Sequence, residues 1–354
     1  MKKVSIVIPC RNEEKFIGKC LDSIIAQDYP KDKLEILVVD GMSEDGTKEV
    51  VEEYSQKHQF IKLFDNPKKI TPCALNIGIK NAQGDIIIRM DAHAKYENYY
   101  IAKCVKYLNE YNVDNVGGVW KIVPRNNTIV GKSIALASSN FFGGGNAHYR
   151  TGNFKEPKWV DTVFGGCYKK EIFDKIGYFN ENLVRSQDME FNLRLKKAGY
   201  KTLLVPDIIV YYYTRSTLRE VFNHRFKDGI WAVVPFKYST IVPVGLRSLI
   251  PLFFVLSLIG SLFLGIFYKP FLYLFFLIIM TYFLTNCYFS AKISISEKNW
   301  RYFPILIFTF ATLHLSYGFG SMVGLIGVLF SKNFWKMRIK KRNRTEVAES
   351  KKQD

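Results

Sequence analysis

The last third of this 354-residue chain contains three long stretches without a single Asp, Glu, Lys or Arg. They run from Ser248 to Tyr268, from Pro270 to Ala291 and from Tyr302 to Ser331. A helix of roughly 20 apolar residues crosses the hydrocarbon core of a bilayer, so the first two stretches fit one crossing each. The third, at 30 residues, is too long for one upright helix. We expect it to form a hairpin or a re-entrant segment, bent near its glycines. The glycines at 318, 320, 324 and 327 could themselves allow close helix packing or a break in the helix, and packing is favoured.

Charge at the end of the chain indicates which side of the membrane the tail occupies. Residues 332–354 hold nine Lys or Arg and three acidic residues, so this tail alone carries +6 of the formal +18. A basic segment directly after a membrane segment is typical of a cytoplasmic flank facing anionic lipid. A nucleic-acid partner is not expected, because no recognised binding motif accompanies the charge.

The start of the chain and its cysteines indicate the compartment of the first domain. The apolar run Val4 to Cys10 is too short for the core of a signal peptide, and no cleavage site follows it. The six cysteines show neither a CxxC pair nor a metal-binding spacing, which favours reduced, buried thiols. We therefore expect the first domain to stay in the cytoplasm.

Short β-branched runs alternate with helical patterns in the first hundred residues. Near-continuous apolar strands joined by helices indicate an α/β fold with a mostly parallel sheet covered on both faces. The expected strands are 4–9, 34–40, 60–64 and 85–90, and the expected helices are 13–27, 47–57 and 72–82. Ligands of such sheets bind at the carboxyl ends of the strands, so the segments 11–14, 40–47 and 91–93 are the candidates for a site.

Asp40 ends the second expected strand and is followed by a glycine-containing loop up to Thr47. A carboxylate there can accept a hydrogen bond from a nucleobase N–H or a ribose hydroxyl, and ligand binding is favoured over a turn role. For Asp45 in the same loop, the turn and helix-capping role is favoured.

Asp91 and His93 follow the fourth expected strand. Residues two apart on an extended segment point the same way, so both side chains can converge on one site. Oxygen and imidazole ligands together suit Mn²⁺ or another borderline divalent ion, whereas Mg²⁺ prefers oxygen alone. A cation there would stabilise a departing nucleoside diphosphate.

Two carboxylates, Asp188 and Glu190, lie at the start of another expected helix. Asp188 is a candidate general base toward an acceptor hydroxyl, and Glu190 is expected to pair with Arg194 four residues on. The alternative is that both merely favour the positive end of the helix.

These motifs together resemble family 2 glycosyltransferases with the GT-A fold, and most closely the succinoglycan-biosynthesis glucosyltransferase type. The resemblance extends from about Val4 to Arg219 and rests on the order of its motifs. The matching runs are 4–14, 38–47, 84–93, 142–146, 160–167 and 187–188.

The resemblance implies a role for each candidate residue. Asp188 would be the catalytic base of an inverting single displacement, and Asp91 and His93 would hold a divalent metal, Mn²⁺ or Mg²⁺, at the diphosphate. The donor-binding residues would be Pro9, Arg11, Glu13, Asp40 and Asp91. The acceptor-side residues would be Asp161, Gly165 and Gln187.

The expected function is therefore transfer of a hexose, glucose from UDP-glucose in the first instance, to a glycan linked to polyprenyl diphosphate. The expected organisation is a catalytic domain 1–214, an interfacial helical linker 215–247, a membrane region 248–331 and a cytoplasmic tail 332–354. The enzyme would be a multi-pass protein of a bacterial inner membrane. The alternatives are a processive polysaccharide synthase, which only three apolar stretches disfavour, and a membrane scaffold that binds nucleotide sugar without catalysis.

Overall fold

The structure, a computed structural model, describes residues 1–145, 148–152, 154–238 and 246–332. The chain divides into two compact units. Unit 1 consists of residues 1–123 and 147–213, and unit 2 of 124–146 and the chain from 214 onward. Segment 124–146, which the sequence assigned to the first domain, thus groups with the C-terminal helices. The basic tail lies outside the described residues except for Lys332.

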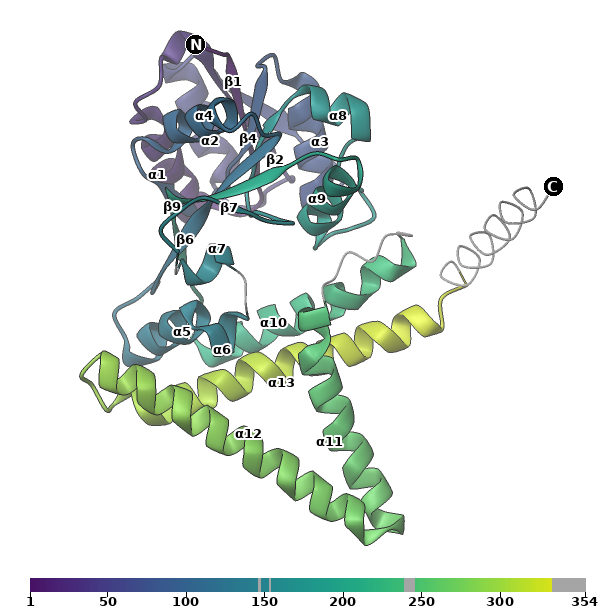
Figure 1. Cartoon of the computed structure of the whole chain (residues 1–354). Coiled ribbons are helices and arrows are strands. Elements are labelled where there is room, and N and C mark those ends of the chain that lie inside the picture. The colour runs from purple at the N-terminus through teal and green to yellow at the C-terminus, as the bar shows by residue number, and fades with distance from the viewer. Residues whose placement is uncertain (146–147, 153, 239–245, 333–354) are drawn as a thin grey trace, which may run out of the picture. The chain divides into compact units, whose positions relative to one another are not determined.

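Unit 1 is built on one twisted, mixed sheet (Figure 1). Its strands are β1 (Val4–Cys10), β2 (Leu34–Asp40), β3 (Ile61–Asp65), β4 (Ile86–Arg89), β5 (Ala94–Tyr96), β6 (Asn115–Val123), β7 (Lys158–Trp159), β8 (Cys167–Lys169) and β9 (Thr202–Tyr213). They lie in the order β3-β2-β1-β4-β8-β6-β9-β5, with β7 paired to β9. The first four strands along that order are parallel, whereas β8 pairs antiparallel with both of its neighbours.

The helices of unit 1 follow the strands as the sequence pattern predicts. They are α1 (Glu14–Ile25), α2 (Thr47–Lys57), α3 (Thr71–Asn81), α4 (Tyr100–Glu110), α7 (His148–Thr151), α8 (Glu171–Ile176) and α9 (Gln187–Lys197), with a short 3₁₀ turn η1 (Lys31–Lys33). The predicted strand 34–40 and helix 47–57 are confirmed residue for residue, and the other early elements agree within two residues. The predicted α/β fold is confirmed.

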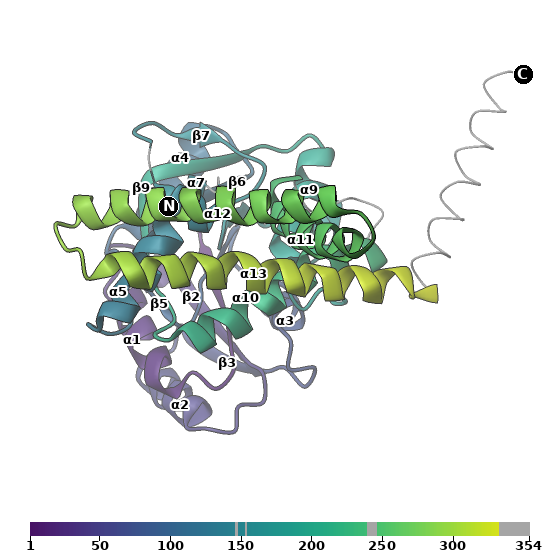
Figure 2. The same cartoon turned by 90° about the horizontal axis from the view of Figure 1, so that it is seen from below.

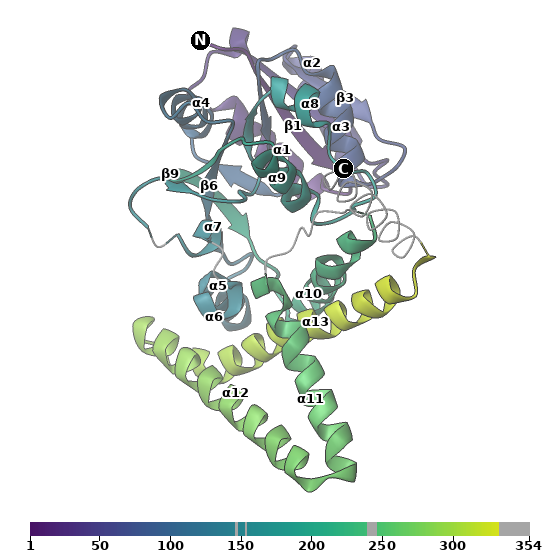
Figure 3. The same ribbon diagram turned by 45° about the vertical axis from the view of Figure 1, so that its right-hand side comes forward.

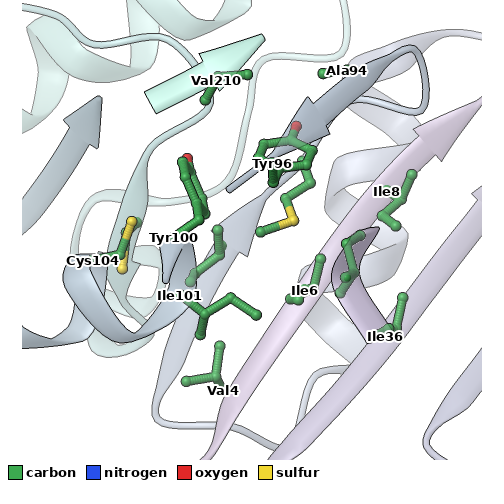
Figure 4. Packing of buried hydrophobic residues seen from close by; sticks show 14 of the residues in the cluster. Val4, Ile6, Ile8, Ile36, Ala94, Tyr96, Tyr100, Ile101, Cys104 and Val210 are labelled. Carbon is green, nitrogen blue, oxygen red and sulfur yellow. The ribbon is translucent and has the colours of Figure 1, made fainter. Parts of the chain in front are cut away.

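Alternating side chains of the central strands build two apolar layers, one on each face of the sheet. Ile6 and Ile8 of β1 pack on one face with residues of α1 and α4, as Figure 4 shows for Tyr100 and Ile101. Val7, between them, packs on the other face with residues of α3, α8 and α9. Since both faces are covered, the strands read as continuous apolar runs in the sequence.

Unit 2 consists of helices. They are α5 (Ile129–Ser139), α6 (Phe141–Gly144), α10 (Leu218–Val233), α11 (Ile250–Phe267), α12 (Lys269–Ser296) and α13 (Tyr302–Leu329), with 3₁₀ turns η2 (Val234–Lys237) and η3 (Leu246–Leu249). Among the described residues, α11, α12 and α13 are long and apolar enough to cross a membrane. α11 and α12 meet at a turn, and α13 lies across their other ends beside α10 (Figures 1 and 3).

The third apolar stretch forms one continuous helix, so the predicted bend near its glycines is wrong. The glycines instead allow close helix packing. A Cβ added at Gly320 would lie 2.0 Å from the backbone oxygen of Phe226 on α10, and one at Gly324 would lie 2.6 Å from that of Ile230. Gly318 meets the backbone of α11 in the same way, at Pro251. Because glycine has no Cβ, the backbones of α10 and α11 can approach α13 closely at these positions. The glycines therefore need no break in the helix.

Candidate active site

A pocket of about 210 Å³ lies at the carboxyl ends of β1, β2 and β4. Five of the residues singled out in the sequence line it together: Pro9, Arg11, Glu13, Asp91 and His93. Its other lining residues are Cys10, Gly41, Asn66, Lys69, Ile70, Thr71, Ala74, Arg89 and Ala92. Parallel sheets bind ligands at this edge, and the structure has a pocket there.

Asp40 ends β2 beside this pocket, with only 1% of its surface exposed. Its carboxylate accepts hydrogen bonds from the backbone N–H of Ser43, at 2.9 Å, and from the Ser43 hydroxyl. These bonds hold the loop after β2 in place, and the neighbours Cys10 and Gly41 line the pocket. The proposed contact of Asp40 with a nucleoside stays a prediction.

Asp45 has the capping role that the sequence favoured. Its carboxylate accepts hydrogen bonds from the backbone N–H groups of Thr47, at 3.1 Å, and Glu14, at 3.3 Å, at the starts of α2 and α1. Although partial burial acts in the opposite direction, a hydrogen bond from the Thr47 hydroxyl, together with these backbone bonds, lowers the pKa of Asp45.

His93 and Glu13 form a contact at the rim of the pocket. The His93 Nδ1 lies 3.2 Å from Glu13 Oε1. A carboxylate on one ring nitrogen fixes the orientation of the imidazole, as it does for histidines that bind a metal. Within the part of the chain that the structure describes, no three His, Cys, Asp or Glu side chains group around one point. The metal site expected at Asp91 and His93 stays a prediction.

Arg89 was not singled out in the sequence, and it joins the catalytic candidate Asp188 to Asp91, the candidate for donor and metal binding. Its guanidinium hydrogen-bonds to Asp188 and, at 3.1 Å, to Asp91 Oδ1. The side chain is buried and lies 5.1 Å above the ring of Phe164. Burial alone would lower the pKa of Arg89, but the charges of Asp188 and Asp91 raise it. The guanidinium is thus a fixed cation between two carboxylates.

The sequence contained a signal for Arg89 that the prediction did not use. It ends the otherwise apolar strand Ile86-Ile87-Ile88 and is buried with the rest of β4. A buried arginine needs carboxylate partners, so Asp91 two residues on was one partner to expect. The other partner, Asp188, is 99 residues away in the chain, and no local pattern indicates it.

Asp188 is the second residue of α9. The helix starts after Ser186, whose φ of 62° is left-handed. Gln187, the first residue of α9, is buried. Glu190 bonds to Arg194 at 2.9 Å, the pairing that the sequence predicts.

The two remaining acceptor-side candidates, Gly165 and Asp161, lie in different surroundings. Gly165, with a φ of 80°, lies just before β8, and the next residue, Gly166, accepts a hydrogen bond from the backbone N–H of Arg89. Gly165 thus lies beside the Arg89 backbone. Asp161, by contrast, pairs with Lys196 at 2.6 Å with both side chains mostly exposed. Asp161 does not line the pocket, and its proposed acceptor role stays a prediction.

An aromatic cluster connects the two sides of the pocket. The ring of Tyr212 contacts His93 edge-on and stacks on Trp120, with centroids 4.3 Å apart. Trp120 in turn contacts Phe164, at 4.2 Å, and Phe164 lies under Arg89. These rings come from β6, β9 and the segment before β8, and periodicity did not single them out.

The sequence profile described as "Glycosyl transferase family 2" matches residues 5–177. The profile described as "Glycosyl transferase family group 2" matches residues 105–323, more than half of the chain.

The chain belongs to glycosyltransferase family 2.

Relatives of this family 2 glycosyltransferase occur in archaea and bacteria. A Methanococcus voltae protein, "Dolichyl N-acetyl-alpha-D-glucosaminyl phosphate 3-beta-D-2,3-diacetamido-2,3-dideoxy-beta-D-glucuronosyltransferase", is 33% identical over 90% of this chain and 96% of its own. The "Succinoglycan biosynthesis protein ExoA" of Rhizobium meliloti is 28% identical over 70% of this chain and 74% of its own. The resemblance drawn from the motifs is therefore confirmed.

A solved structure supports the same fold. The mannosyltransferase PcManGT of Pyrobaculum calidifontis, in complex with GDP-Man and Mn²⁺, superposes with a TM-score of 0.51 at 25% identity. The match covers 66% of this chain and 63% of that one. The predicted GT-A fold of this glycosyltransferase is confirmed.

Proposed function

We propose that this glycosyltransferase transfers a single hexose, with inversion at the anomeric carbon, from a nucleoside diphosphate donor to a polyprenyl-diphosphate-linked glycan. Asp188 acts as the base that removes a proton from the acceptor hydroxyl. The donor diphosphate lies at the pocket formed after β1, β2 and β4. The membrane helices keep the enzyme at the surface where a lipid-linked acceptor is found.

One observation carries this proposal: Arg89 contacts both Asp188 and Asp91. The candidate base, Asp188, is therefore separated from Asp91, the carboxylate proposed for the diphosphate site, only by the guanidinium of Arg89. An inverting displacement needs the base and the departing diphosphate in one active site, because the acceptor hydroxyl must attack the anomeric carbon while the diphosphate departs.

The donor site has the chemistry of a metal-assisted diphosphate site. Asp91 and His93 would hold a divalent ion, Mn²⁺ or Mg²⁺, with Glu13 orienting the imidazole through its 3.2 Å contact. The ion would neutralise charge on the leaving diphosphate. That the Pyrobaculum calidifontis mannosyltransferase was solved with GDP-Man and Mn²⁺ supports this assignment.

The donor is a nucleoside diphosphate sugar and the acceptor is a lipid-linked glycan. Asp40 would bind the nucleoside, and Pro9 and Arg11 the rest of the donor, with UDP-glucose as the first candidate. The acceptor would contact Gly165 and Gln187 near α9, with Asp161 further out. The names of two relatives support a lipid-linked or polysaccharide acceptor, since one acts on a dolichyl phosphate glycan and the other in succinoglycan biosynthesis.

The test uses membranes that contain the full-length chain, a panel of radiolabelled nucleotide sugars, and an extract of polyprenyl-linked oligosaccharides. Label entering the lipid fraction from one donor, and absent with membranes lacking the protein, would support the proposal and name the sugar. Analysis of the product linkage would test inversion. Binding of a nucleotide sugar without transfer to any lipid-linked acceptor would instead favour a non-catalytic scaffold.

A further inference from the structure

Helix α13 has two different faces along its whole length. Its buried positions recur every three or four residues and include Leu306, Phe310, Leu313 and Gly320. The exposed stripe between them is apolar throughout: Phe308, Phe319, Val323, Ile326 and Phe330. A helix with one packed face and one exposed apolar face lies at a boundary between protein and an apolar phase.

The packed face of α13 is covered by α5 and α10, and residues of α11 and α12 also pack against it. Ile134 and Ala137 of α5 pack against the first half of α13, and Val233 of α10 packs near Val328 at its end. In α13, 39% of the most apolar segment is buried, against 17% in α11 and 6% in α12. α13 is therefore shielded on one side from end to end, unlike the other two long helices.

Most exposed residues of α10 are hydrophilic. Arg219, Asn223 and Lys227 recur every four residues, and Glu220 is exposed beside them; Phe222 is the exposed apolar residue among them. Figures 1 and 2 show α10 beside α13, and backbone contacts at Gly229 and Gly320 confirm how closely they pack. The exposed side of α10 therefore belongs in water or among lipid headgroups. Because α13 packs against α10, α13 lies at the same depth.

Charged and polar groups also lie on the middle of α13. Arg225 lies 5.7 Å above the ring of Tyr317, and its guanidinium donates to the backbone oxygen of Gly143. Asp228 lies 3.6 Å from Arg225. If α13 crossed the bilayer upright, these charges would lie near its centre, at a cost of several kcal/mol each.

We propose that α13 lies in the membrane interface, with its apolar stripe in the lipid, and that α11 and α12 are the only crossing pair among the described helices. Lys332, which follows α13, then lies on the same side of the membrane as the start of α10. The inference rests on membrane insertion but not on the proposed reaction.

The distribution of charge agrees with this arrangement. The turn between α12 and α13 carries Lys298, Arg301 and one acidic residue, Glu297; Lys292 lies in the last part of α12, and the tail carries +6. At the junction of α11 and α12 the one charged residue is Lys269, the first residue of α12. With an interfacial α13, the basic turn and the basic tail are both cytoplasmic, as the positive-inside rule requires. With three crossings, the tail would lie outside.

The first test labels single introduced cysteines of the full-length chain with a membrane-impermeant maleimide, before and after permeabilising the expressing cells. The unmodified chain measures background from its own cysteines. We expect Tyr268→Cys to label in intact cells, and Lys298→Cys and Lys351→Cys only after permeabilisation. Labelling of Lys351→Cys in intact cells would overturn the proposal, and so would a protected Tyr268→Cys.

A second test measures the depth of α13 directly by spin labels at Phe308→Cys, Phe319→Cys and Ile326→Cys in lipid vesicles. Positions 308 and 326 are about 27 Å apart along the helix axis, close to the ~30 Å thickness of the hydrocarbon core. An interfacial helix gives three similar, shallow depths and high accessibility to dissolved oxygen. A depth gradient along the helix would show a crossing. Labels shielded from oxygen would show that a protein partner covers the stripe. Either result contradicts the proposal.

Discussion

At the scale of single residues, the buried guanidinium of Arg89 is the contact that brings a distant carboxylate to the pocket. Asp91 is two residues away in the chain, whereas Asp188, in α9, is 99 residues away. Breaking a buried ion pair by removing one partner leaves an uncompensated charge, which is far more destabilising than losing an exposed pair. Arg89 is thus expected to matter for stability and for positioning at once.

Substituting Arg89→Met should lower the free energy of unfolding by about 3–5 kcal/mol, because two partly buried carboxylates lose their cation. Arg89→Lys should retain part of that stability, since a lysine keeps the charge but not the forked geometry. Unfolding in detergent solution measures both.

The matched control is Arg11→Met, because Arg11 pairs with Glu44 through two exposed side chains. Such surface pairs contribute about 0–1 kcal/mol. Equal loss of stability for Arg89→Met and Arg11→Met would contradict the role given to Arg89.

Glu181 provides a pH-dependent test of the fold around α3. Its carboxylate accepts hydrogen bonds from Lys68, at 2.6 Å, and from Asn76, at 3.1 Å. The bonds from Lys68, Asn76 and Cys73 lower the pKa of Glu181 to about 2. A depressed pKa means that the contribution to stability is complete above the ordinary value and is lost as the pH falls toward 2.

We expect Glu181→Gln to be less stable than the natural chain by about 1 kcal/mol at pH 7, a modest figure because solvent screens this partly exposed carboxylate. The difference should shrink below about pH 4.5, as the natural carboxylate becomes protonated. Denaturant midpoints of both proteins between pH 7 and pH 3 measure it. A difference that grows on acidification would rule out this reading.

Single residues were predictable where the chemistry is local. Pro9 lies near the end of β1, Arg11, Glu13, Asp91 and His93 follow strands, and all five line the pocket. Asp40, Gly165, Gln187 and Asp188 do not line it, and neither does Asp161, although its motif resembles that of the family. Its position depends on the path of the loop before β8, and it pairs with Lys196 of α9. Arg89 was missed because its second partner is far away in the sequence.

At the scale of elements, periodicity predicted the first half of unit 1 well and the third apolar stretch poorly. β2 and α2 agree with their predicted bounds because apolar runs and turn residues mark both ends. α13 remains a single helix because its glycines are matched by the α10 backbone. A length of uncharged sequence cannot distinguish an upright helix from one that packs along a neighbour.

Gly320→Ala should destabilise the α10–α13 pair, because the new Cβ would lie 2.0 Å from the backbone oxygen of Phe226. Overpacking of this kind typically costs about 1–3 kcal/mol. Gly327→Ala on the same helix is the matched control, since nothing lies within 4 Å of its added Cβ. Thermal unfolding in detergent micelles compares the two. If Gly327→Ala is as destabilised as Gly320→Ala, helix packing is not the reason for the glycines.

At the scale of the whole molecule, the chain combines a GT-A glycosyltransferase unit with a helical unit that contains three long apolar helices. Composition alone indicated both, because charge alternates with apolar runs up to about residue 247 and then disappears over long stretches. The grouping of 124–146 with the helical unit had no sequence signal. α5 is short and apolar, and only packing against α13 shows where it belongs.

The central claim is that this glycosyltransferase uses Asp188 as its catalytic base. The most direct measurement compares the rate of sugar transfer to the lipid fraction by the natural chain, by Asp188→Asn and by Asp174→Asn, an exposed carboxylate on α8. We predict that Asp188→Asn loses about 10²–10⁴ in rate while still binding the donor, and that Asp174→Asn transfers at the natural rate. Transfer by Asp188→Asn at the natural rate would contradict the account.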